Sequence, residues 1–128
     1  MQFQQTIIDA YRRLCIKKDI KEIEQWLEVL ENNNEDLTYL NTIGTQLIKS
    51  LAVVNHVKSI RRKNVLMVAA LCKYEQSLKT EFEYGKVPYD EVRVKQHENK
   101  RQQYQQLIKD YNELKIAIYK TLITYRRR

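Results

Sequence analysis

The chain has 128 residues, 43% of them hydrophobic and 30% charged, and its formal net charge is +7. This length fits a single helical domain (1–128), and the composition excludes a disordered acidic chain. Two glycines and one proline are too few for the turns of a sheet protein, so we expect an all-α fold with few, long helices.

Two apolar stripes at helical spacing occupy the first third of the chain. The first consists of Phe3, Ile7, Tyr11 and Leu14, and the second of Ile16, Ile20, Ile23, Leu27 and Leu30. The second stripe is rotated from the first, and Asp19 with Glu22 resembles a capping box. The pattern predicts helices at about 3–17 and 19–31, or one helix kinked near residue 18. The stretch NNNED at 32–36 then predicts a turn, with Asp36 capping the next helix.

One long helix is expected over 37–84, where no proline occurs and Gly44 is the only glycine. Unbroken, it would be about 70 Å long, which a compact monomer of this size cannot accommodate. The helix is therefore either broken near 55–64 or part of an elongated molecule. The run VLMVAALC at 65–72 is apolar on all sides, which implies contacts in more than one direction. It is too short to cross a bilayer as a helix.

The stretch EYGKVPYDE at 83–91 contains the only proline and one of the two glycines. We expect Gly85 to end a helix in the left-handed conformation and Pro88 to begin the next one, which runs to about residue 125. The predicted architecture is a long helical hairpin, 37–84 with 88–125, and one or two N-terminal helices packed along it as a helical bundle.

Heptad-like apolar positions on both arms of the hairpin predict a coiled-coil-like seam and a homo-oligomer. The predicted oligomer seam comprises Asn64, Met67, Leu71, Tyr74, Tyr104, Leu107, Tyr111, Leu114 and Ile118. Asn64 is the polar exception within its arm. It either is buried and fixes the register, or lies half exposed on a rotated stripe.

Residue spacing along the chain favours no catalytic, metal or cofactor site, so we expect a non-enzymatic protein. Neither His56 nor His97 follows a glutamate by three residues, and the cysteines form no CxxC pair. We expect Cys72 to be a core residue and His97 to be solvated. Two cysteines are no disulfide framework, and Asp9 places a charge where a signal peptide would need a continuous apolar region, so a cytoplasmic or intracellular location with reduced thiols is expected.

The basic residues are concentrated in the C-terminal third, where residues 85–128 hold 11 Lys/Arg and 5 Asp/Glu. Three clusters could contact phosphates: Lys58, Arg61, Arg62 and Lys63; Arg93, Lys95, Lys100 and Arg101; and Arg126, Arg127 and Arg128. The sequence thus predicts an accessory or structural subunit that binds nucleic-acid backbone weakly, in a salt-sensitive way, within a nucleoprotein assembly. The alternative is an adaptor or inhibitor, for example from a phage or mobile element, that binds an acidic protein surface.

Overall fold

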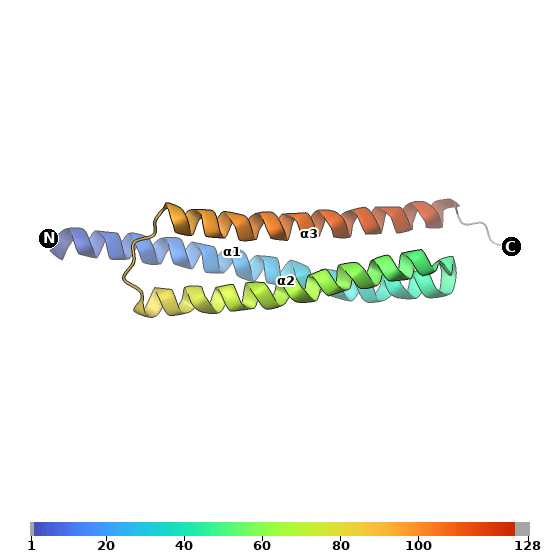
Figure 1. The fold of residues 1–128 in the computed structure, drawn as a ribbon, viewed down its shortest axis with the longest axis horizontal. Helices are drawn as coiled ribbons and strands as arrows, with labels where there is room; N and C mark the ends of the chain where they lie inside the picture. Colours follow the sequence, from blue (N-terminus) through green and yellow to red (C-terminus); the bar gives the residue numbers. More distant parts are fainter. Residues whose placement is uncertain (1, 125–128) are drawn as a thin grey trace.

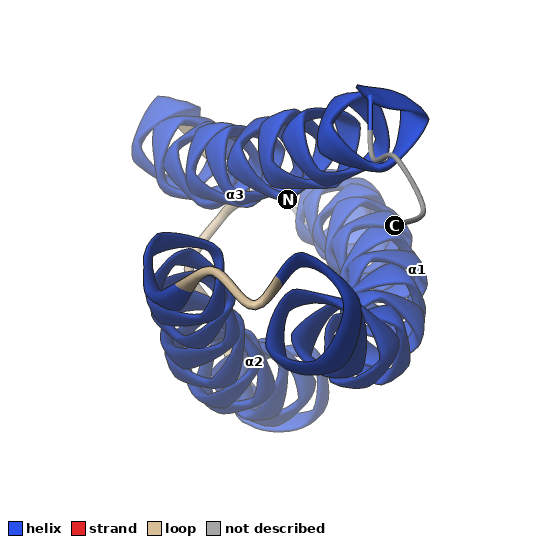
Figure 2. Ribbon diagram, turned by 90° about the vertical axis from the view of Figure 1, so that its right-hand side faces the viewer, coloured by secondary structure: helices blue, strands red, loops and turns tan. Residues whose placement is uncertain are grey.

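The computed structural model describes residues 2–124, with side chains from Phe3 onward, and its described residues form three long helices and no strand. These are α1 (Gln2–Ile43), α2 (Leu51–Tyr84) and α3 (Glu91–Thr124), with a short π-helix η1 (Gly44–Ile48) between the first two. Consecutive helices run in opposite directions along one elongated bundle (Figure 1). Viewed along its length, the three helices lie at the corners of a triangle (Figure 2). The predicted all-α helical bundle is confirmed.

The helix α1 is continuous from Gln2 to Ile43, so the predicted break near residue 18 and the predicted turn at 32–36 are wrong. The physical reason lies in its buried face. Ile16, Ile23, Leu30 and Leu37 recur every seven residues and are all essentially inaccessible to solvent. Burial of such a row stabilises a helix more than the turn preference of three asparagines opposes it. Asp36 lies within α1 and caps no helix.

The first chain reversal occurs at residues 44–50, which corrects the predicted helix 37–84 and its alternative break near 55–64. Lys49 adopts the left-handed conformation (φ 52°, ψ 43°) and donates its N–H to the Gly44 carbonyl. The Ser50 hydroxyl then caps α2 by accepting the Val53 N–H at 3.3 Å. A Cβ atom on Gly44 would lie 3.0 Å from Cγ1 of Val53, so glycine permits the close approach of η1 to α2.

The second connection, between Tyr84 and Glu91, lies where the sequence places it, but its details differ. Gly85 is extended (φ −74°, ψ 152°) and not left-handed. The helix α3 begins at Glu91, after Pro88, because the Asp90 carboxylate accepts the Arg93 N–H at 3.1 Å and so acts as the N-cap.

Two apolar clusters form the interior of the bundle. One consists of Ile16, Ile23, Trp26, Leu30, Leu71, Leu78 and Leu107, and the other of Leu37, Leu40, Val57, Ile60, Tyr111, Leu114 and Ile118. The residues of the predicted oligomer seam lie in or against these clusters, apart from the polar Asn64, which is itself buried. They pack among the three helices of one chain, and self-association remains a prediction.

Two buried polar side chains align α1 with α2. Arg12, which is 1% exposed, donates from Nη1 to the Glu81 carbonyl at 2.6 Å, near the end of α2. Asn64 is 3% exposed and donates from Nδ2 to the Leu30 carbonyl at 3.0 Å. Asn64 is thus buried, and the hydrogen bond it makes joins two helices of the same chain. A shift of one helix along the other would break both bonds.

The apolar run at 65–72 is not surrounded by contacts, contrary to expectation. Leu71 is buried, whereas Val65 is 56% exposed, Leu66 is 61% exposed and Cys72 is also exposed. In a three-helix bundle each helix has neighbours on one side only, so the other face of α2 remains open. Within the part of the chain that the structure describes, no helix combines the length and hydropathy needed to cross a membrane.

Candidate functional site

The first half of α1 carries an apolar face that lies outside the bundle. We call Phe3, Ile7, Tyr11 and Leu14 the N-terminal face; they are 76%, 52%, 59% and 68% exposed. At 100° per residue these four side chains share one side of the helix, while the buried Arg12 and Ile16 lie on the opposite side. The first of the two apolar stripes in the sequence therefore faces solvent, whereas the second stripe, which is rotated from it, packs inside the bundle.

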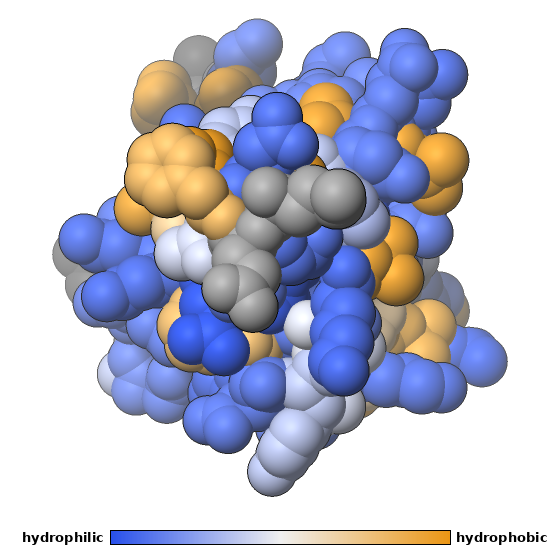
Figure 3. All heavy atoms as spheres, turned by 90° about the vertical axis from the view of Figure 1, so that its left-hand side faces the viewer, coloured by the Kyte–Doolittle hydropathy of each residue, from blue (hydrophilic) through white to orange (hydrophobic). Residues whose placement is uncertain are grey.

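The position of the interhelical contacts explains why the N-terminal face is open. Arg12 bonds to Glu81, close to the end of α2, and Asp19 accepts from Tyr89, just before α3 begins. The part of α1 before these contacts projects beyond the connection between α2 and α3 (Figure 1). Figure 3 looks onto this end of the molecule, where hydrophobic side chains lie on the surface among polar ones.

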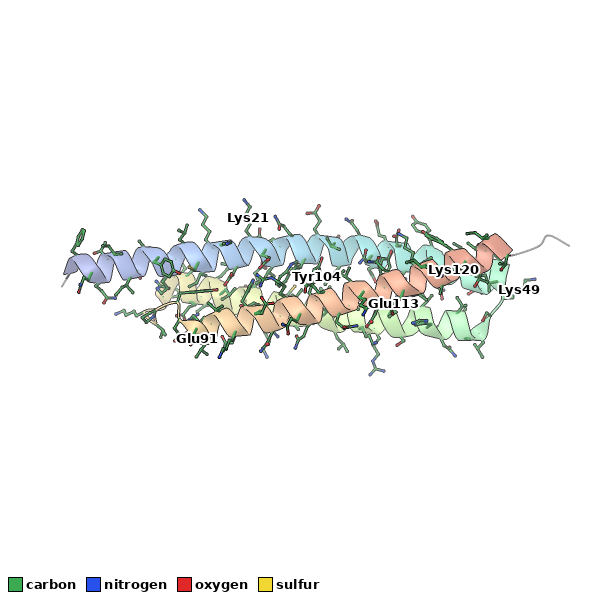
Figure 4. All side chains as sticks on the ribbon, turned by 90° about the horizontal axis from the view of Figure 1, so that it is seen from above. Lys21, Lys49, Glu91, Tyr104, Glu113 and Lys120 are labelled. Atoms are coloured by element: carbon green, nitrogen blue, oxygen red, sulfur yellow. The ribbon has the colours of Figure 1, made fainter. Side chains whose placement is uncertain are left out.

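Three lysines follow the N-terminal face along the same helix. Lys17, Lys18 and Lys21 are exposed, and none of them makes an ion pair or hydrogen bond with another described residue. Lys21 points away from α2 and α3 (Figure 4). One to two turns further on, Glu24 and Glu28 are exposed as well. The outer surface of α1 is therefore apolar, then basic, then acidic.

A second site is buried between α1 and the start of α3. We call it the His97 cluster, and its members are Asp19, Glu22, Tyr74, Tyr89, His97 and Arg101. Nε2 of His97 lies 2.5 Å from Oε1 of Glu22 and 3.4 Å from Oδ1 of Asp19. Nδ1 of His97 lies 2.9 Å from the Tyr74 hydroxyl. A contact as short as that with Glu22 needs a proton between the two atoms, and the Nε2–H of the imidazole can donate it to the carboxylate while Nδ1 accepts from the Tyr74 hydroxyl.

The two carboxylates of the cluster respond differently to their surroundings. Burial raises the pKa of Asp19 despite the hydrogen bond from Tyr89 and the nearby imidazole. Burial also opposes ionisation of Glu22, but the hydrogen bonds from Arg101 and His97 outweigh it and lower the pKa of Glu22. Burial raises the pKa of the Tyr89 and Tyr74 hydroxyls, which therefore remain protonated; Tyr89 donates to Asp19, and the direction of the Tyr74 bond depends on the His97 tautomer.

Aromatic rings enclose the imidazole. The Trp26 ring stacks on His97 at a centroid distance of 5.3 Å and on Tyr104 at 5.1 Å, and the Tyr74 ring is tilted 5.7 Å from His97. His97 is only 3% exposed, so the expectation that it is solvated is wrong. Its carboxylate neighbours come from another helix, and spacing within α3 could not reveal them.

The predicted phosphate-binding clusters are largely engaged within the chain. Arg93 pairs with Glu81 at 2.5 Å, Arg101 with Glu22 at 2.7 Å, and Lys63 with Asp110 at 3.6 Å. Arg61 donates to Thr38, Lys95 lies 4.0 Å from Glu91, and Lys100 lies over the Tyr74 ring. Lys58 and Arg62 are exposed and have no such partner among residues 2–124. Arg126, Arg127 and Arg128 lie outside the described residues.

No protein-family model matches the sequence, and comparisons with curated proteins and with solved structures also give no match.

Proposed function

We propose that this protein is a non-catalytic adaptor that binds another protein through the N-terminal face of α1. The observation that carries the proposal is the exposure of four large apolar side chains on the side of α1 opposite the bundle. Contiguous exposed apolar surface on a projecting helix is typical of a docking element. An amphipathic helix commonly binds by laying its apolar side against a groove or a second helix.

Charge complementarity indicates an acidic partner. Lys17, Lys18 and Lys21 continue the N-terminal face and have no carboxylate among the described residues to neutralise them. A partner with an apolar groove or helix followed by carboxylates would complement both parts of this surface. The charges would speed association and select the partner, and the apolar contacts would supply most of the affinity.

A second copy of the chain fits this surface less well. Asp9 is the only carboxylate of α1 before Asp19, and it is already paired with Arg12 and Arg13. The N-terminal face of a second copy therefore offers the three lysines no free carboxylate. A flat anionic membrane also fits less well, because Glu24 and Glu28 follow on the rigid, continuous α1 and would be repelled by its headgroups.

Binding of a model helix provides the test. The probe is a fluorescein-labelled amphipathic peptide with leucines at i, i+3, i+4 and i+7, flanked by glutamates; the matched peptide carries lysines instead. We expect saturable binding of the acidic peptide by fluorescence anisotropy and much weaker binding of the basic one. Leu14→Glu should abolish this binding, whereas Leu66→Glu, on the exposed face of α2, should leave it unchanged.

The same samples distinguish the other occupants. Sedimentation of the protein alone measures self-association, and flotation with phosphatidylserine vesicles measures binding to an anionic membrane. Self-association or vesicle binding that Leu14→Glu removes, without binding of the acidic peptide, would replace the adaptor proposal. Equal binding of the acidic and basic peptides would contradict it too.

As a second function we propose weak contact with nucleic-acid backbone. The specific support is that Lys58 and Arg62 are exposed on one side of α2, one turn apart, with no partner among the described residues. Such contacts would be electrostatic and would lack base readout. Because Arg93 and Arg101 are paired internally, they contribute little to this surface.

Charge reversal at the unpaired residues tests this second proposal. Binding of a labelled single-stranded oligonucleotide should fall steeply from low salt to about 0.15 M salt. Lys58→Glu/Arg62→Glu should abolish binding, while Lys109→Glu/Lys120→Glu, an equal change of charge on exposed lysines of α3, should weaken it only modestly. Equal loss in both pairs would indicate a response to net charge alone and contradict a defined surface.

A further inference from the structure

We infer that the His97 cluster is a binding site for a divalent transition-metal ion such as Zn²⁺, ligated by Asp19, Glu22 and His97. One ligand atom from each of these side chains lies within 4.8 Å of the other two. Imidazole nitrogen and carboxylate oxygen are both ligands that Zn²⁺ accepts. The site would join α1 to α3 and is independent of the N-terminal face.

The distances between the ligand atoms suit such an ion after a small adjustment. Zn–N and Zn–O bonds of about 2.0–2.2 Å at a tetrahedral angle hold ligand atoms about 3.3–3.5 Å apart. Nε2 of His97 and Oδ1 of Asp19 are already 3.4 Å apart. Oε1 of Glu22 is closer to Nε2, at 2.5 Å, because that pair now shares a proton. The ion would take the place of the proton on Nε2, the neutral imidazole would carry its one proton on Nδ1 instead, and the partly exposed Glu22 side chain would withdraw by about 1 Å to reach the ligand separation of a tetrahedral site.

Each ligand is already oriented by another side chain. Nδ1 of His97 lies 2.9 Å from the Tyr74 hydroxyl; with the ion bound, Nδ1 would carry the imidazole proton and donate it to the Tyr74 oxygen, leaving Nε2 free for the ion. The Tyr89 hydroxyl donates to Oδ2 of Asp19 and leaves Oδ1 for the ion. Arg101 holds both oxygens of Glu22. Such outer partners are characteristic of metal sites, where they fix the ring orientation and increase the affinity of the ligands.

The excess of negative charge around the cluster also favours binding of a divalent cation. Asp19 and Glu22 face the imidazole, and Glu98 lies on the far side of Arg101 and pairs with it. Arg93 is neutralised by Glu81. Arg101 pairs with Glu22 and Glu98, and Asp19 faces only the imidazole and the Tyr89 hydroxyl, so carboxylates outnumber the cations of the cluster even when Lys100, which lies over the Tyr74 ring, is counted. A divalent ion would offset this excess negative charge.

Metal titration of the full chain tests the inference. The experiment uses Cys15→Ser/Cys72→Ser protein, because free thiolates bind Zn²⁺ themselves. After treatment with chelator, we expect one Zn²⁺ per chain by calorimetry, a higher melting temperature, and visible absorption bands when Co²⁺ is added. His97→Gln should abolish these effects, and Tyr74→Phe should weaken binding about 10-fold by removing an outer partner.

Matched variants separate the site from nonspecific binding. His56→Gln removes the only other histidine, which is exposed, and should leave binding unchanged. If His97→Gln does not fold, the metal affinity of Asp19→Asn and Glu22→Gln tests the inference in its place. Both variants keep an acceptor oxygen for Tyr89 or Arg101, and circular dichroism verifies that they remain helical. Wild-type affinity in these variants, loss of binding in His56→Gln, or no binding of Zn²⁺ by the parent would each overturn the inference.

Discussion

The two ends of the bundle are stabilised in different ways. In the polar half, around the connection between α2 and α3, the side chains of Arg12, Asp19 and His97 are buried among apolar residues. In the apolar half, next to η1, the interior consists of aliphatic side chains such as Ile60 and Leu114, with one tyrosine. Apolar burial contributes most of the folding free energy but is non-directional, so it permits one helix to slide along another. A buried polar group, by contrast, needs a hydrogen-bond partner at one particular position. Both halves have an apolar interior, and the polar half in addition contains buried groups that specify how the helices align.

The largest expected effect is a cavity in the apolar half. Ile60→Ala removes a side chain that is 2% exposed, and we expect unfolding free energy to fall by about 2–5 kcal/mol in urea denaturation. Leu66→Ala, at an exposed position of the same helix, should change it by less than about 0.5 kcal/mol. A similar loss in both variants would mean that α2 packs differently.

Loss of a buried charge from the polar half should have a smaller effect. Arg12→Met keeps most of the side-chain volume but removes the donor to the Glu81 carbonyl, and we expect a loss of about 2 kcal/mol. The Asp9 carboxylate that also faces Arg12 is partly exposed and remains hydrated. Arg13→Met is the control, because Arg13 forms a solvent-exposed pair with Asp9 and lies over the Phe82 ring, and its replacement should cost under about 1 kcal/mol. Equal losses would argue against a role for the buried hydrogen bond.

Replacing the polar group at the boundary between the halves should leave stability equal or higher. Asn64 is buried, and its Oδ1 has no hydrogen-bond partner among the described residues. Asn64→Leu removes this unsatisfied atom, so we expect a gain of up to about 1 kcal/mol in chemical denaturation. Asn55→Leu, at an exposed site of α2, should be close to neutral. A loss of more than about 2 kcal/mol in Asn64→Leu would contradict this expectation, because the hydrogen bond to the Leu30 carbonyl would then stabilise the fold by more than the unsatisfied Oδ1 destabilises it.

The smallest effect concerns the pH dependence of the apolar half. The Tyr111 hydroxyl donates to Asp36 at 2.6 Å and lowers the pKa of that carboxyl, with Lys115 adding to the effect. A lowered pKa in the folded state stabilises the protein above the unfolded value of about 3.9, and this stability is lost as the pH falls through the folded pKa. Asp36→Asn should therefore reduce stability at pH 7 and flatten its decline toward pH 3.

This change should stay below about 1 kcal/mol, because the Asp36 side chain is nearly half exposed and salt screens it. Urea denaturation at several pH values measures it. Tyr111→Phe removes the same hydrogen bond and should flatten the decline in the same way. An unaltered decline in Asp36→Asn would assign the acid sensitivity to other carboxylates.

The parts of the fold that the sequence predicts depend on local patterns. The seam from Val57 to Leu78 and the position of the connection at 83–91 follow from apolar spacing and from the clustered Gly85 and Pro88. The first reversal lies elsewhere than predicted because three asparagines resemble a turn, while Gly44 and Ser50 are dispersed among apolar residues. In α1, burial of a seven-residue repeat prevails over local turn preference.

The His97 cluster could not be found from spacing along one helix, because His97 lies 75 residues from Glu22, on a different helix. A signal nevertheless exists in α1. Arg12, Asp19 and Trp26 recur every seven residues beside the row of Ile16, Ile23 and Leu30, so polar groups occupy core positions of a heptad. A polar group at such a position needs a buried partner, and the heptad pattern by itself therefore singles out Asp19.

The chain contains a single tryptophan, and its position gives the protein an internal optical probe. Because Trp26 is stacked between His97 and Tyr104, excitation of its indole samples only the interface of α1 with α3. The emission of the unlabelled protein therefore reports whether α1 and α3 remain packed together at this interface.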